Sequence, residues 1–334
     1  MARIGIVGAG AWGTALAAVA ARNRHHVTLW AHEDEVVAAI NRGHENTVFL
    51  PGIALDPTIW ASRDLARAGD AEIVLLVAPA QHVRRVCAEL RSSVKADAVL
   101  VICAKGIEQG SGALLSTVVG ETLPDHAIAV LSGPTFAAEV ARNLPTAVTI
   151  ACAERALGDR LSTALGGRRF RPYYSDDVIG TEIGGAVKNV LAIACGIAEG
   201  RGFGDNARAA LITRGLAEIG RLSQVLGGRP ETLMGLSGIG DVVLTCTSTQ
   251  SRNFSLGLAL GRGQSLAEAL TGRRAVVEGV TTAASVAALS SSRGVDMPIA
   301  TAIAAVLHRG ADLDQTIDGL LARPFRAEQH GADP

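Results

Sequence analysis

A glycine-rich turn near the N-terminus places the strongest constraint on the fold of this chain. The apolar run Arg3–Val7 leads into Gly8, Gly10 and Gly13, spaced G-x-G-x-x-G, and a helical segment begins near Thr14. In this arrangement the first glycine permits a tight turn, the second leaves room for a ligand, and the third lets the helix pack close to the strand. The N–H groups at the helix start then favour a pyrophosphate. The pattern predicts a dinucleotide-binding loop; the alternative is a glycine-rich turn with a purely structural role.

Short apolar runs bounded by turn signals continue through the first half and alternate with helical segments. The predicted strands are Arg3–Val7, Val27–Trp30, Ile73–Val77, Ala98–Cys103, Ala127–Leu131 and Ala147–Ala151, and the predicted helices include Thr14–Arg22, Asp34–Arg42 and Val83–Leu90. Continuous apolar runs are typical of parallel strands that are buried on both faces. The alternation therefore predicts an α/β, Rossmann-type doubly wound sheet with helices on both sides.

The second half of the chain has a different pattern. From about Gly184 it is rich in alanine and leucine at helical spacing and lacks period-two strands, which predicts an all-α domain. We expect a dinucleotide-binding domain at 1–184, a helical substrate or catalytic domain at 185–325, and a flexible tail at 326–334.

Composition excludes several classes of protein. The 334 residues suffice for two domains, and 48% hydrophobic with 19% charged residues excludes a disordered chain. Because 31 basic residues nearly balance 32 acidic ones, we expect no nucleic-acid partner. The 5 cysteines are scattered without a C-x-x-C pair, which favours reduced thiols and a cytoplasmic protein, and no metal-ligand spacing occurs, so we expect no metal.

One segment could be mistaken for a membrane span or signal peptide. Ile4–Ala21 carries no charged side chain, but its glycines would weaken a membrane helix and have assigned places in a strand–turn–helix unit. We expect no other segment to be apolar enough to span, and hence no membrane insertion.

Only three of the basic residues are lysines, so each lysine is a candidate for a specific role. Lys105 directly follows a predicted strand, where ligands of open parallel sheets bind. Lys188 lies in an apolar helical stretch, and Gly184, one turn earlier, would let a flat ring approach the amine. A lysine can exchange a proton, whereas an arginine cannot. The alternative for Lys188 is a lysine at a domain edge that extends its amine to water.

Three polar segments could complete a ligand site. In Ser132–Ala137, the small residues would admit a ligand and Thr135 could donate a hydrogen bond, although a Gly-Pro turn needs no ligand. Asp241 follows a glycine-rich loop and could orient a catalytic lysine. Ser251-Arg252-Asn253 provides donors suited to a phosphate. Alternatively, Ser251 is only a helix N-cap and Arg252 a solvated charge in the first turn.

The residues after the second predicted strand bear on cofactor choice. An acid there would bind the adenosine ribose of NAD, and a cation would accept the additional phosphate of NADP. His32, Glu33 and Asp34 offer both kinds. The two acids could equally begin the next helix, and His32 could be a surface residue, so the preference stays open.

Taken in order, these motifs resemble those of the bacterial NAD(P)-dependent sn-glycerol-3-phosphate dehydrogenases. The resemblance runs from Gly5 to about Pro298 through the segments GAGAWGTALA, AKGIE, SGPTFAAEVA, GGAVKNVLAI, FGDNARAALITRGLAEI, SGIGDVVLTCTSTQSRN and VVEG. It implies a Rossmann domain, a helical domain and a cleft between them. It also implies interconversion of sn-glycerol 3-phosphate and dihydroxyacetone phosphate for phospholipid synthesis. A homodimer is a possible assembly, and the sequence leaves the oligomeric state open.

The resemblance also implies roles for individual residues. Lys188 would be the proton acceptor, with Lys105 and Asp241 as its catalytic companions. The implied substrate contacts are Lys105, Gly133, Thr135, Lys188, Asp241, Ser251, Arg252 and Asn253, with Asn189, Asn206 and Thr245 as further polar contacts. The implied contacts of NAD(H) or NADP(H) are Gly8, Gly10, Ala11, Trp12, Gly13, His32, Lys105, Ala137, Arg252, Val276 and Glu278. Ala11 stands where the family often has serine, which removes one hydroxyl contact to the cofactor phosphates.

Two other functions are compatible with the residues. A dehydrogenase of the beta-hydroxyacid type shares the Rossmann-plus-helical plan and a lysine–asparagine pair, but would not require a phosphate on its substrate. A dinucleotide-sensing protein could keep the fold without turnover. Retention of Lys105, Lys188 and Asp241 argues against the second alternative.

Overall fold

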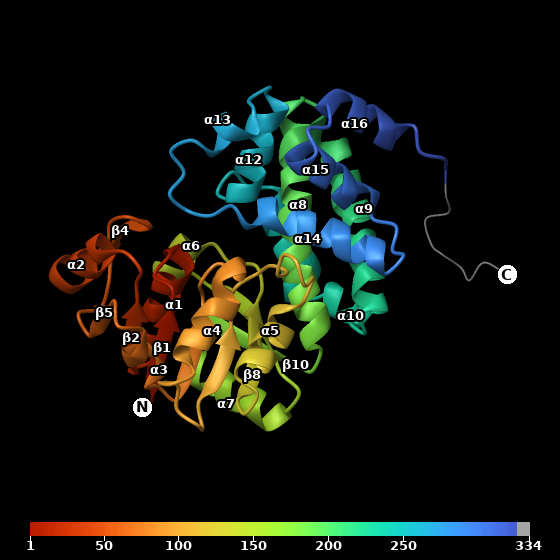
Figure 1. Cartoon of the computed structure of the whole chain (residues 1–334). Helices are drawn as coiled ribbons and strands as arrows, with labels where there is room; N and C mark the ends of the chain where they lie inside the picture. The colour runs from red at the N-terminus through yellow and green to blue at the C-terminus, as the bar shows by residue number, and fades with distance from the viewer. Residues whose placement is uncertain (326–334) are drawn as a thin grey trace.

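A computed structural model describes residues 1–325, and the predicted tail at 326–334 lies outside the described residues. An eight-stranded sheet forms the N-terminal half, below the helices of the C-terminal half in Figure 1. Its strands are, in spatial order, β10 (Phe170–Ser175), β9 (Thr146–Ala151), β8 (Ala127–Ser132), β7 (Val99–Ile102), β6 (Ile73–Leu76), β1 (Arg3–Val7), β2 (His26–Trp30) and β5 (Ile59–Ser62). A separate hairpin pairs β3 (Glu45–Asn46) with β4 (Leu50–Ala54).

The sheet is parallel except at one junction. β8 and β9 pair antiparallel, so the prediction that all six apolar runs lie parallel is wrong for β9. The connection between them contains only a short helix, α6 (Ala137–Ala141), and does not cross back over the sheet. The edge strands β5 and β10 were not predicted, because edge strands are not buried on both faces and lack a continuous apolar run.

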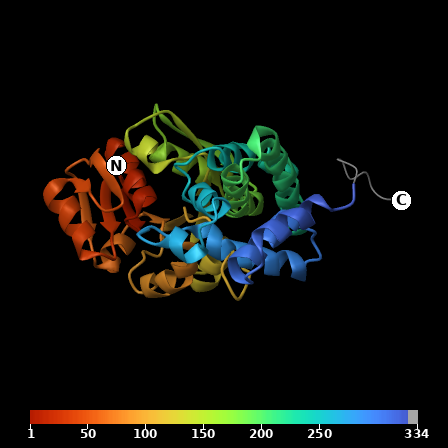
Figure 2. The same cartoon turned by 90° about the horizontal axis from the view of Figure 1, so that it is seen from above.

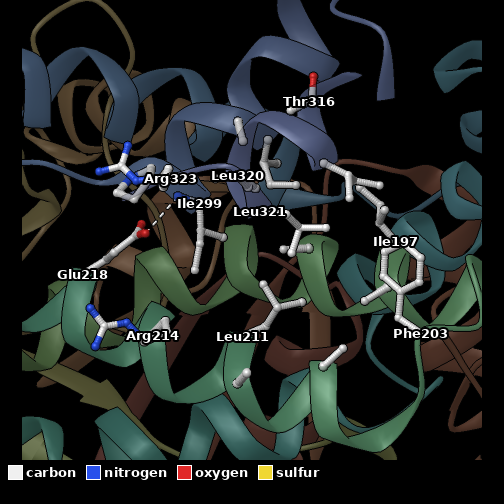
Figure 3. A pocket seen from close by; sticks show the side chains of 18 of the residues that line it. Ile197, Phe203, Leu211, Arg214, Glu218, Ile299, Thr316, Leu320, Leu321 and Arg323 are labelled. Atoms are coloured by element: carbon white, nitrogen blue, oxygen red, sulfur yellow. Dashed lines mark hydrogen bonds between the residues drawn. The ribbon is translucent and has the colours of Figure 1, made fainter. Parts of the chain in front are cut away.

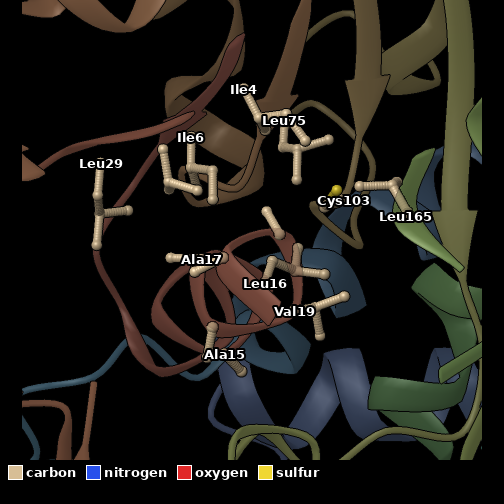
Figure 4. Close-up of a cluster of buried hydrophobic side chains, with 14 of the residues drawn as sticks. Ile4, Ile6, Ala15, Leu16, Ala17, Val19, Leu29, Leu75, Cys103 and Leu165 are labelled. Atoms are coloured by element: carbon tan, nitrogen blue, oxygen red, sulfur yellow. The ribbon is translucent and has the colours of Figure 1, made fainter. Parts of the chain in front are cut away.

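Helices cover both faces of the sheet. They are α1 (Ala11–Arg22), α2 (Asp34–Gly43), α3 (Leu65–Gly69), the 3-10 turn η1 (Ala80–His82), α4 (Val83–Leu90), α5 (Leu115–Thr122), α6 and α7 (Arg155–Leu165). Figure 4 shows how α1 places Leu16 and Val19 against Ile4, Ile6 and Leu75 of the sheet, all of them buried. This apolar contact fixes the start of α1 at the carboxyl end of β1.

The C-terminal half forms no strand among the described residues from Val178 to Phe325. Its elements are α8 (Val178–Gly200), α9 (Gly204–Val225), α10 (Pro230–Leu233), the π-helical turn η2 (Leu236–Gly240), α11 (Asp241–Cys246), α12 (Arg252–Gly261), α13 (Leu266–Leu270), α14 (Glu278–Ser292), α15 (Pro298–His308) and α16 (Leu313–Leu321). Viewed from above, these helices extend away from the sheet on one side (Figure 2). The α/β half with an all-α half is the predicted fold class.

The long helix α8 connects the two halves. Asp177 caps it by accepting a hydrogen bond from the Gly180 N–H at 2.8 Å, and Gly184 and Gly185 lie inside it, so the expected boundary falls within a continuous helix. By length and composition alone α8 could span a membrane, contrary to our expectation that no segment besides Ile4–Ala21 could. However, 89% of its most apolar window is buried in the protein, as in a core helix. Ile4–Ala21 itself forms β1, the turn and most of α1.

Helix α12 packs beside α8 through glycines. A Cβ on Gly257 would overlap the carbonyl oxygen of Ile193, and one on Gly261 would lie 2.5 Å from that of Ile197. Each pair is separated by 64 positions in the chain, and so are Asn189 and Asn253, which share a hydrogen bond. The two helices therefore run parallel in a fixed register, which brings the start of α12 level with the middle of α8.

Candidate active site

The glycine-rich turn has an open ligand face. Gly8 has a φ of +120°, and a Cβ on Gly13 would overlap the carbonyl oxygen of Gly8, so the turn requires glycine at both positions. Among residues 1–325, no atom lies within 4 Å of where a Cβ on Gly10 would be. Helix α1 begins at Ala11, with no side-chain cap and no acidic residue in its first turn. Its N–H groups are thus available to a phosphate, and the turn fits a bound dinucleotide.

Two lysines share one buried carboxylate at the junction of the two halves. Lys188 Nζ of α8 donates to Asp241 Oδ1 at 2.5 Å, and Lys105 Nζ, just after β7, donates to Asp241 Oδ2 at 2.6 Å. Lys188 also donates to Thr245 Oγ1 at 2.8 Å, one turn beyond Asp241 on α11. Lys105 also donates to the carbonyl oxygen of Gly133 at 3.1 Å, after β8. Four separate segments thus hold both amines in place.

Burial controls the charge of this cluster. The side chain of Asp241 is 0% exposed and that of Lys188 is 8% exposed. Desolvation lowers the pKa of Lys188 to about 8; Asp241 opposes this change, and the nearby Lys105 ammonium adds to it. Lys188 can therefore exchange a proton near neutral pH, which is the property of a general acid or base.

Gly133 and Thr135 form the loop next to Lys105. Gly133 has a φ of +141°, and a Cβ there would lie 3.0 Å from Val148 Cα, so the position favours glycine. Thr135 Oγ1 donates to the Gly133 carbonyl oxygen at 3.3 Å. The loop thus orients the same carbonyl that holds Lys105, and it leads into α6, which begins at Ala137.

The predicted phosphate segment lies at the start of α12. Ser251 caps the helix by accepting from the Phe254 N–H at 3.2 Å, so the N-cap alternative describes its contact here. Asn253 is buried; it donates to Asn189 Oδ1 and accepts from the Gly279 N–H, both at 2.9 Å. Arg252 is exposed, and within residues 1–325 its guanidinium makes no hydrogen bond or ion pair. Ser251 and Asn253 thus use their side chains within the fold, whereas the guanidinium of Arg252 is available to bind a ligand.

The remaining predicted cofactor contacts lie outside the lysine cluster. Trp12 Nε1 and Glu278 Oε2 are buried, and neither has a hydrogen-bond partner in the described part of the chain. Glu278 Oε1 accepts from the Ala80 N–H at 3.1 Å, which joins α14 to the turn η1 that follows β6. Val276 is 45% exposed before α14, and His32 is exposed after β2. Buried polar atoms without a partner are typical of a site that is completed by a ligand.

Glu182 is a buried acidic residue near the cluster that the sequence motifs did not predict. It lies on α8, accepts hydrogen bonds from the backbone and hydroxyl of Ser116, and its pKa is raised to about 7 by burial. Together with Lys105, Ser132 and Gly185 it lines a small cavity of about 10 Å³ behind the lysine. The signal was present, because Glu182 and Lys188 are the only charged side chains in the long apolar run from Val178 to Ala198.

A cavity of about 650 Å³ lies apart from this cluster, between α8, α9, α15 and α16. Apolar residues line it, including Ile197 and Leu211, with Arg214 and Glu218 at one side (Figure 3). None of the predicted site residues lines it. In the described residues, no group of three or more His, Cys, Asp or Glu side chains could hold a metal ion.

The protein combines a dinucleotide-type turn with a buried Lys–Asp–Lys cluster, which lies between a Rossmann-type sheet and a helical half. This combination is typical of the nicotinamide-dependent dehydrogenases. Comparison with known proteins identifies the group within this class. The family models for the N-terminus and the C-terminus of NAD-dependent glycerol-3-phosphate dehydrogenase match residues 3–158 and 177–318.

Similar proteins agree with these matches. The glycerol-3-phosphate dehydrogenases [NAD(P)+] of Rhodospirillum rubrum and Parvibaculum lavamentivorans are 59% and 56% identical, over 97% and 98% of this chain and 93% and 98% of theirs. The crystal structure of glycerol-3-phosphate dehydrogenase from Coxiella burnetii superposes with a TM-score of 0.93 at 42% identity, covering 96% of this chain and 99% of that one. The chain belongs to the NAD-dependent glycerol-3-phosphate dehydrogenase family.

Proposed function

We propose that this protein interconverts sn-glycerol 3-phosphate and dihydroxyacetone phosphate with NAD(H) or NADP(H). The observation that carries the proposal is the buried pair of Lys188 and Asp241, which provides an amine with a lowered pKa at the junction of the nucleotide-binding and helical halves. The family membership supports the substrate assignment.

In the proposed reaction, neutral Lys188 accepts the proton of the C2 hydroxyl. A bound nicotinamide would supply the hydride acceptor for C2. In the reverse direction the protonated Lys188 amine polarises the ketone and returns its proton to the C2 oxygen. The positive charge of Lys105 favours the neutral form of Lys188. The hydrogen bonds to Asp241 and Thr245 fix the orientation of the Lys188 amine. The exposed guanidinium of Arg252 would hold the substrate phosphate, and the N–H groups of α1 would hold the cofactor pyrophosphate.

The deciding experiment measures oxidation of NADPH, and separately of NADH, by purified protein with dihydroxyacetone phosphate. Dihydroxyacetone without phosphate is the control. Turnover that depends on the phosphate supports the proposal. Cofactor binding without turnover of either compound would instead favour the beta-hydroxyacid type of dehydrogenase or a sensing protein.

The proposed setting of the reaction is the cytoplasm, where it would supply glycerol 3-phosphate for phospholipid synthesis, and a homodimer is the assembly to be tested. Light scattering of the purified protein tests the dimer. Loss of phospholipid labelling on depletion of the protein in its host, restored by added glycerol 3-phosphate, tests the supply role.

A further inference from the structure

Arg63, which follows strand β5, lies next to the residues after β2 that choose between NAD and NADP in folds of this kind. His32 follows β2 about 20 residues after the last glycine of the turn, where NAD enzymes carry an acid for the adenosine ribose. At the same edge, Ser62 ends β5, pairs with Trp30, and accepts a hydrogen bond from the Ala31 N–H at 3.0 Å. Arg63 is the next residue. It therefore lies at the carboxyl end of the sheet beside His32.

Contacts at this edge hold Arg63 in place. Trp30 Nε1 donates to the carbonyl oxygen of Arg63 at 3.0 Å, which fixes its backbone against the end of β2. The ring of Trp30 lies 6.3 Å from that of His32, centroid to centroid. Arg63 Nη1 donates to Asp34 Oδ2 at 2.8 Å, and its side chain is 51% exposed. Within the described residues this is its only side-chain partner, so most of its N–H donors are available to an anion.

The three acids of this segment are not equivalent. Asp34 pairs with Arg63, and Glu35 pairs with Arg274 of the helical half at 2.9 Å. Glu33 occupies the N-cap position of α2 without capping the helix through its side chain. Among the described residues, Glu33 is the one of the three acids without an ion-pair partner, so it could bind a ribose hydroxyl. It lies beside His32 and near the Arg63 cation.

We propose that Arg63 and His32 form the binding site for the 2′-phosphate of NADP(H), and that Arg63 makes the protein prefer NADP(H) over NAD(H). The kinetic test of this inference rests on the proposed function, because it uses the proposed substrate. The binding test does not. A guanidinium with free donors fits a phosphate dianion, and it is attached to a strand end rather than to a long loop.

The first test measures binding without turnover. Calorimetry compares adenosine 2′,5′-bisphosphate with adenosine 5′-monophosphate, which lacks the 2′-phosphate. We expect the wild-type protein to bind the bisphosphate about 10-fold or more tightly, and Arg63→Gln to lose most of that difference without weakening the monophosphate. Arg67→Gln is the matched control, because Arg67 is 64% exposed near the same strand end and pairs only with Asp64 among the described residues.

The second test uses kcat/KM with dihydroxyacetone phosphate. Arg63→Gln should lower the value for NADPH about 10- to 100-fold and leave that for NADH within about twofold. Equal binding of the two fragments by the wild-type protein, or equal loss of both in Arg63→Gln, would overturn the proposal. Loss of NADH use in Glu33→Gln, with NADPH unchanged in Arg63→Gln, would overturn it in favour of a ribose-binding Glu33. Absence of turnover with both cofactors contradicts the proposed function only, since the fragment binding is still measurable.

Discussion

The side-chain amide of Asn253 donates to the side-chain oxygen of Asn189 at 2.9 Å, across the contact between α12 and α8. Asn189 is the neighbour of Lys188, and Asn253 is the neighbour of Arg252. This hydrogen bond thus connects the segment that carries the proposed proton-accepting amine with the segment proposed to bind the phosphate.

Removal of the Arg252 charge should weaken recognition of the phosphate. In Arg252→Gln we expect KM for dihydroxyacetone phosphate to rise about 10- to 100-fold, because a charge-assisted hydrogen bond to the phosphate is lost. Activity on unphosphorylated dihydroxyacetone, if measurable in the wild-type protein, should not change. Arg262→Gln, at the other end of α12, serves as control. An unchanged KM would contradict the assignment of Arg252.

Replacement of Lys188 should abolish chemistry and retain cofactor binding. In Lys188→Ala we expect kcat to fall by about 10²- to 10⁴-fold, the usual contribution of a general acid or base. Binding of NADPH, measured by fluorescence, should remain within about threefold of the wild-type value, since the glycine-rich turn lies on a different segment. Lys95→Ala is the control, because Lys95 is a half-buried lysine outside the cluster that pairs with Asp70. Near-normal turnover in Lys188→Ala would refute its role.

The pH profile should report the titration of Lys188. Oxidation of glycerol 3-phosphate needs the neutral amine, so kcat/KM should rise with pH and level off above about 8. Reduction of the ketone needs the ammonium, so the reverse reaction should decline above the same pH. The Arg252→Gln variant should keep this midpoint. Profiles that run in the same sense for both directions would exclude a single proton-transferring amine.

Two alanine substitutions separate folding from cofactor binding in the glycine-rich turn. In Gly10→Ala the new Cβ meets no atom of the described chain within 4 Å, so the thermal midpoint should remain within about 2 °C while NADPH affinity falls about 10-fold or more. Gly13→Ala forces its Cβ against the Gly8 carbonyl oxygen and should destabilise the protein by about 1–3 kcal/mol. Calorimetric melting and cofactor titration of both variants provide the check. Unchanged affinity in Gly10→Ala would argue against a pyrophosphate at this turn.

The buried Glu218 should make stability depend on pH. Its carboxyl group accepts the N–H bonds of Ile299 and Ala300 at the start of α15, and burial raises its pKa from 4.5 to about 7. The folded state therefore binds a proton between these values that the unfolded state has released, so this contribution is present below about 4.5 and is lost as the pH rises through 7. The loss amounts to about 3 kcal/mol at 1.36 kcal/mol per pKa unit.

The variant Glu218→Gln should therefore flatten the stability profile between pH 5 and about pH 8, as measured by urea unfolding at a series of pH values. Glu231→Gln, at an exposed position, is the control. A profile in Glu218→Gln that matches the wild-type one would show that another group is responsible.

Local sequence patterns predicted many of the helices and strands. They did not predict how distant segments pair in the sheet. Helix α4 has the predicted bounds, Val83–Leu90, because its apolar positions recur at helical spacing. No local sequence pattern indicates that β9 runs antiparallel to β8, because the direction of a strand depends on how the preceding connection returns to the sheet. β10 contains Pro172 and the exposed Tyr173 at the sheet edge, where no continuous apolar run is required.

The candidate site shows the same limit. Residue types and positions alone predicted Lys188, Lys105 and Asp241 as candidates, and the structure brings all three into one cluster. Their roles remain predictions. The expected use of Gly184 is not what the structure shows, because a Cβ there would lie 2.5 Å from the Ser237 carbonyl oxygen, so the position admits a neighbouring backbone and not a ring. Only tertiary contact distinguishes these two uses of glycine.

The glycine contacts between α8 and α12 also have a consequence for substrate selection. Gly257 and Gly261 leave no space for the helices to approach more closely, and side chains at these positions would push them apart. The close contact therefore holds the backbones of Lys188 and Arg252 at a fixed separation. If the two residues have the proposed roles, we expect the enzyme to favour substrates in which the reacting hydroxyl and the phosphate are as far apart as in glycerol 3-phosphate, and to use a homologue with one more carbon between them poorly.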